Sequence, residues 1–117
     1  MKHTIDTLVK FWKDSYQNDK YSDEAIENIA ANCLSLSETW FDNNRPREGE
    51  SFCVTLINKE GVNVNDLFGV TRENLPETMI KTLTTESDTY SKMVVKSFLG
   101  GFDGVATAKV IGELEIN

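Results

Sequence analysis

The first third of the chain places apolar residues at helical spacing in two segments. Between Thr4 and Gln17 they recur every three or four positions, which predicts an amphipathic helix capped by Thr4. A second helix is expected from its cap at Ser22 to about Asp42, because Asn43 and Asn44 stop it and Pro46 prevents continuation. The short connection favours an antiparallel helical hairpin whose apolar faces meet in one core.

Beyond Arg45 the pattern becomes typical of strands. Residues 51–58 are rich in β-branched and aromatic side chains and too few for a stable helix, so we expect a strand there. Residues 59–61 indicate a turn, and residues 62–64 a short return strand. Residues 66–70 show no clear pattern.

A short helix is expected after residue 73. Asn74 is its predicted cap, Pro76 fits the first turn, and Glu77 stands at the capping-box position. Met79, Ile80 and Leu83 would form the apolar side of this short helix.

The last third allows two interpretations. Residues 90–99 fit a helix capped by Ser87 or Asp88, and equally a strand with alternating faces. The glycines in 100–104 indicate a turn, and 105–116 has β character, so we favour a β-hairpin across that turn. Without repeats or a linker, residues 1–117 form one domain, of α+β class: an N-terminal antiparallel helical hairpin packed on a small antiparallel β-sheet, with a short inserted helix.

The net charge of the chain and the distribution of its basic residues exclude some classes of partner. The net charge is −7 and the twelve basic residues form no run, which disfavours direct binding to nucleic acid or to anionic membranes. No stretch has the length and hydrophobicity of a membrane span, and the N-terminus lacks a signal peptide, so we expect a cytoplasmic protein.

The side chains that carry most enzyme chemistry are scarce. The one histidine, His3, is expected to fray and so to be a poor general base. Cys33 and Cys53 are expected to be buried and reduced, and they match no zinc spacing. Glu48 and Glu50 could form a catalytic pair, but loop carboxylates flanked by arginines are usually solvated. We therefore expect no enzyme, no metal and no cofactor.

One acidic surface remains as a candidate site. Residues 21–44 contain five acids and no lysine or arginine, and a helical wheel places four of the acids opposite the apolar face: Glu24, Glu27, Glu38 and Asp42. Exposed helices normally mix signs, because Glu–Lys pairs stabilise them. This face is either a solvated surface or a docking surface for a basic partner. Its acids form two pairs about 16 Å apart, too sparse to mimic nucleic acid.

Trp40, near the end of the same helix, is a candidate anchor for a partner, although aromatic residues on an apolar face more often belong to the core. These features favour a small protein-binding module, such as an inhibitor or immunity-type protein that covers a basic functional surface of another protein. The alternative is a structural or assembly subunit that forms a homo-oligomer. The small size of the chain and its ten asparagines would suit a phage or mobile-element product.

Overall fold

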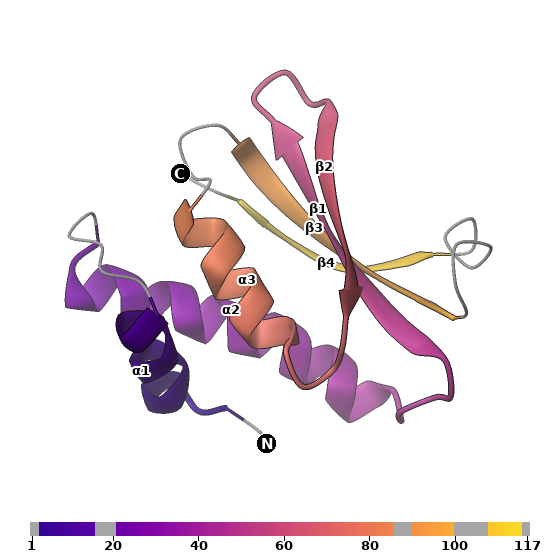
Figure 1. Ribbon diagram of the computed structural model, residues 1–117, viewed down its shortest axis with the longest axis horizontal. Coiled ribbons are helices and arrows are strands. Elements are labelled where there is room, and N and C mark those ends of the chain that lie inside the picture. The colour runs from indigo at the N-terminus through magenta and orange to yellow at the C-terminus, as the bar shows by residue number, and fades with distance from the viewer. Residues whose placement is uncertain (1–2, 16–20, 86–89, 100–107, 116–117) are drawn as a thin grey trace.

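The fold was obtained as a computed structural model, which describes residues 3–15, 21–85, 90–99 and 108–115. Within them, three helices and four strands follow one another in the order ααββαββ (Figure 1). The elements are α1 (Ile5–Ser15), α2 (Asp23–Asn43), β1 (Glu50–Asn58), β2 (Asn63–Val70), α3 (Leu75–Thr85), β3 (Tyr90–Leu99) and β4 (Lys109–Glu115). The predicted α+β class, with a helical hairpin at the N-terminal side and a helix inserted between strands, is confirmed.

The first two helices begin at the hydroxyl side chains that the sequence indicated. The Thr4 hydroxyl oxygen accepts a hydrogen bond from the Thr7 N–H at 3.2 Å. Ser22 Oγ accepts one from the Ala25 N–H at 3.1 Å. Each cap satisfies a backbone donor that the first helical turn leaves without a partner, so both predicted caps are confirmed.

Two asparagines end α2, as the sequence predicted. The side-chain amide of Asn43 donates to the Thr39 carbonyl at 2.7 Å, and that of Asn44 donates to the Trp40 carbonyl at 2.9 Å. Both bonds hold the asparagine side chains against carbonyls near the end of the helix. The backbone of Asn44 is extended, so the chain leaves the helix toward β1.

β1 lies inside the sheet, whose strand order is β2-β1-β3-β4 with antiparallel neighbours throughout. β1 and β2 form a hairpin in which Gly61 has a φ of 83° and Asn58 Oδ1 accepts a hydrogen bond from the Val62 N–H. Because β2 and β3 are each antiparallel to β1, they point in the same direction, and α3 is the crossover between them.

The strand predictions are confirmed, and β2 is longer than expected. β2 continues through residues 66–70, where the extra residue of a bulge opposite Phe52 and Val54 breaks the period of two. Residues 90–99 form a strand and not a helix. β4 covers the middle of the predicted 105–116 strand. The predicted glycine turn at 100–104 lies outside the described residues.

The core lies between the sheet and the helices, which lie together on one side of the strands (Figure 1). Alternate side chains of β1 and β3 point into it and are fully buried: Phe52, Val54, Leu56, Met93 and Val95. Ile26, Ala30 and Cys33 of α2 and Leu75, Met79 and Ile80 of α3 supply the helical side. The α1 helix is tied to α3 by Trp12, whose Nε1 donates to Thr84 Oγ1 at 2.9 Å.

Gly112 lets β4 approach α2 closely. A Cβ atom at this position would lie 2.5 Å from Leu36 Cδ1 and 2.6 Å from Leu36 Cγ, well inside van der Waals contact. We therefore expect Gly112→Ala to lower the free energy of unfolding in urea by about 1–3 kcal/mol through overpacking. Leu36→Ala in the same chain should recover most of that loss. Equal losses with and without Leu36 would show that the contact is not the cause.

Candidate functional site

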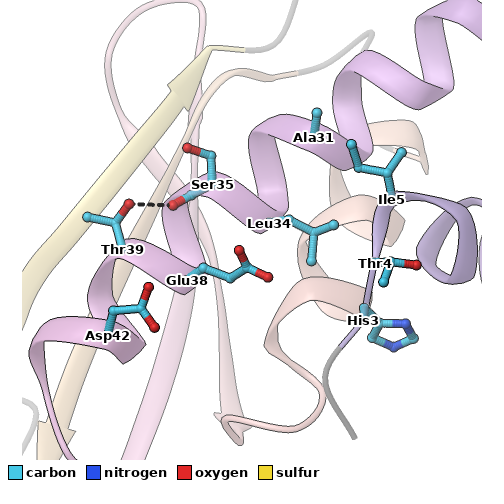
Figure 2. A pocket seen from close by; sticks show the side chains of 9 residues that line it. All are labelled: His3, Thr4, Ile5, Ala31, Leu34, Ser35, Glu38, Thr39 and Asp42. Carbon is cyan, nitrogen blue, oxygen red and sulfur yellow. Dashed lines mark hydrogen bonds between the residues drawn. The ribbon is translucent and has the colours of Figure 1, made fainter.

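Two adjoining cavities lie along the second half of α2. One has a volume of about 570 Å³ and is lined by His3, Thr4, Ile5, Ala31, Leu34, Ser35, Glu38, Thr39 and Asp42 (Figure 2). The other has a volume of about 290 Å³ and is lined by His3, Leu34, Ser37, Glu38, Phe41, Asp42, Arg72, Glu73 and Pro76. Because His3, Leu34, Glu38 and Asp42 line both, we treat the cavities as one site, the acidic groove.

His3 forms the wall of the acidic groove on the side of α1. Its Nε2 lies 2.7 Å from Glu77 Oε1 of α3, and its Nδ1 lies 3.1 Å from Thr7 Oγ1. Only 11% of the His3 side chain is exposed, so the expectation that it frays is wrong. Glu77 therefore contacts His3, while the Asn74 N–H donates to Thr71 Oγ1. The predicted capping box between Glu77 and the Asn74 N–H is therefore not formed, because both groups have other partners.

Arg72, just before α3, closes the second cavity. Its Nε donates to Glu50 Oε1 at 2.6 Å, and its Nη2 donates to Glu50 Oε2 at 3.3 Å and to the Asn44 carbonyl. The guanidinium carbon also lies 4.8 Å from the centroid of the Phe41 ring. The Glu50 side chain is only 5% exposed, so it is not the solvated loop carboxylate that the sequence suggested. Glu50 neutralises the charge of Arg72, so its role is structural and not catalytic.

The groove carries negative charge that its own basic residues do not neutralise. His3 and Arg72, the basic residues lining it, each contact a carboxylate. Asp42 and Glu73 are exposed, and their carboxylates make no hydrogen bond or ion pair within the part of the chain that the structure describes. Glu38 adds a third carboxylate one turn before Asp42. The apolar lining comes from Leu34, Phe41 and Pro76, so the groove combines acid groups with apolar surface.

The predicted acidic face is divided by the fold. Glu38 and Asp42 line the groove, whereas Glu24 and Glu27 are exposed near the start of α2 and line neither of its cavities. Trp40 is 9% exposed and belongs to the core. Its Nε1 is buried and has no hydrogen-bond partner among the residues that the structure describes, and Lys109 Nζ lies 5.6 Å from its ring centroid. The structure thus does not present Trp40 on the groove.

His3, Arg72 and Glu73 complete the groove, and sequence reasoning missed all three. They come from the approach to α1 and from the loop before α3, far apart in the chain. A usable signal was present only in Arg72 and Glu73, a charged pair directly before a predicted helix. His3 gave no signal, because its role depends on contact with Glu77.

The two cysteines are free and buried, as predicted. Cys33 faces the core, where burial raises the pKa of its thiol to about 12. Cys53 lies on the opposite face of β1. Burial is the main cause that raises the pKa of the Cys53 thiol, and Asp66 adds to it while Thr55 and Lys96 oppose it. Both thiols are therefore protonated and weakly nucleophilic at neutral pH.

Among residues 3–15, 21–85, 90–99 and 108–115, no three His, Cys, Asp or Glu side chains gather as metal ligands would. Within the same residues, no helix combines the length and hydrophobicity that crossing a bilayer requires. Comparison of the chain with protein families, with curated proteins and with solved structures gave no match.

Proposed function

We propose that this chain is a small cytoplasmic protein-binding module whose acidic groove receives basic side chains of another protein. By covering that basic surface it would act as an inhibitor or immunity-type protein. The observation that carries the proposal is that Glu38 and Asp42 line both cavities and that Glu73 joins them in the second. The two free cysteines are in keeping with a reducing compartment.

The groove has the composition that a lysine or arginine side chain needs. The methylene stem of such a residue packs well on apolar surface such as Leu34, Phe41 and Pro76. Its charged head then reaches carboxylates at the rim, which make charge-assisted hydrogen bonds. Asp42 and Glu73 have no competing ion pair among the described residues, so neither must break one to bind.

Reversal of the two groove acids on α2 tests the proposal. The partner would first be isolated from the source cell on the immobilised chain and identified, and its affinity then measured by calorimetry. We expect Glu38→Lys with Asp42→Lys to weaken that complex at least about 100-fold, because each reversal replaces attraction by repulsion. Raising the salt concentration should weaken the wild-type complex as well.

The same helix supplies a matched control. Glu24→Lys with Glu27→Lys changes the net charge by the same amount but lies outside the groove. We expect this variant to bind within about 3-fold of wild type apart from long-range attraction. Equal losses in both variants would mean that only overall charge matters. An unchanged affinity in the groove variant would remove the groove from consideration.

A further inference from the structure

The β4 strand forms one edge of the sheet and borders a second groove. Within the described residues it pairs with β3 on one side only. In an edge strand, alternate residues direct their N–H and C=O groups away from the sheet, where they are open to pairing with another chain. A cavity of about 330 Å³ lies beside this edge, between Asn32, Ser35, Leu36 and Thr39 of α2 and residues 111–114 of β4.

The two faces of β4 differ in chemistry. Glu113 and Glu115 lie on the face that the helices do not cover, where Lys92 contacts Glu113 at 3.5 Å. Toward α2, three apolar side chains are only half-buried and pack against the core at the rim: Leu36, Ile111 and Leu114. A strand added alongside β4 would cover these apolar groups on one face and meet carboxylates on the other.

We propose that β4 accepts an extended segment of another protein as a fifth strand, one in which basic and apolar side chains alternate. Main-chain hydrogen bonds to the edge would give affinity, and the alternation would give specificity. The apolar side chains would enter the groove beside α2, and the basic ones would face Glu113 and Glu115. The inference does not rest on the acidic groove: Ser35 and Thr39 line both cavities, but the groove acids Glu38 and Asp42 do not line the cavity beside β4.

The opposite edge is a poorer template. β2 also borders a cavity, next to α3, but its pairing with β1 shifts register twice, so its edge is irregular. Residues Gly112–Glu115 of β4 pair with β3 without interruption, and the one shift of this ladder comes beyond them. Charged residues on an edge strand also deter aggregation. Protection from aggregation would explain the charges on β4. It would not explain the groove beside α2 or the half-buried apolar side chains at its rim.

An eight-residue peptide of alternating lysine and valine, with blocked ends, is the probe. We expect it to bind the full chain with a dissociation constant of about 0.1 mM and to slow amide hydrogen exchange in residues 111–115 at least about 10-fold by NMR. A peptide of alternating glutamate and valine should not bind. Glu115→Lys should weaken binding of the lysine peptide at least about 5-fold, and the distant Glu60→Lys should not.

Methylated peptides separate strand addition from simple charge attraction. Methylating the backbone nitrogens of every lysine, or of every valine, removes all donors along one edge of the peptide. We expect one of the two peptides to lose binding and the other to keep it. Equal binding by both, or no slowed exchange in β4 at about 1 mM peptide, would overturn the proposal. Loss of binding in Glu38→Lys with Asp42→Lys would place the peptide in the acidic groove and overturn it too.

Discussion

Arg72→Met is expected to lower the free energy of unfolding by about 3–5 kcal/mol. The substitution keeps most of the side-chain volume but removes both hydrogen bonds to the Glu50 carboxylate. Glu50 is 5% exposed and, of its cationic partners in the described part of the chain, would retain only Arg47, whose Nε lies 4.0 Å away and whose side chain is half exposed. A carboxylate left buried without a close partner is costly, and urea denaturation at neutral pH measures that cost.

A double-mutant cycle separates the pair from the rest of the Arg72 environment. Glu50→Gln together with Arg72→Met removes both charges, so the double variant should be more stable than Arg72→Met alone. Any remaining loss then belongs to the Asn44 carbonyl and the Phe41 ring, which Arg72 also contacts. If the two single losses simply add, the pair is not coupled and the predicted cause is wrong.

Alkaline pH is expected to destabilise the protein through Cys33. Its thiol ionises near 9.0 when solvated, whereas burial raises its pKa to about 12 in the fold. Between these values the unfolded chain has lost the proton that the folded chain keeps. The stability tied to this group is therefore fully present below pH 9 and declines by about 1.4 kcal/mol per pH unit above it, up to about 4 kcal/mol.

Urea denaturation between pH 8 and pH 11 would measure this slope, with Cys33→Ala as the test variant. The slope of the wild type should exceed that of Cys33→Ala, because the variant has no thiol to ionise at this position. Cys53→Ala is the comparison variant: because burial also raises the pKa of the Cys53 thiol, its loss should reduce the slope in the same direction. Parallel curves for wild type and Cys33→Ala would show that other groups cause the alkaline loss.

The fold was predictable where its signals are local. Thr4 and Ser22 act as caps within a few residues of the chain, and the apolar periodicity of α2 depends only on its own sequence. Local signals failed where the structure breaks a simple period. The bulge in β2 hid residues 66–70, and the helix and strand periods both fitted residues 90–99 until pairing with β1 decided between them.

The candidate site was predictable only in part, for the same reason. Glu38 and Asp42 were found because they share one helix face. Glu77 looked like part of a capping box, and Glu50 looked solvated, because neither His3 nor Arg72 is near its partner in the sequence. Trp40 illustrates a different limit, since a helical wheel gives the direction of a side chain but not the element that covers it.

The crossover by α3 has a consequence for cooperativity. β1 pairs with β2 through a short turn, but it pairs with β3 only after the chain has passed through the whole of α3. Closing that longer loop costs entropy before any contact is gained, so the β1–β3 ladder should form late in folding. The two hairpins cannot be separated without breaking that central ladder. A cut between them would leave neither half with a complete sheet, so the chain should unfold as one unit.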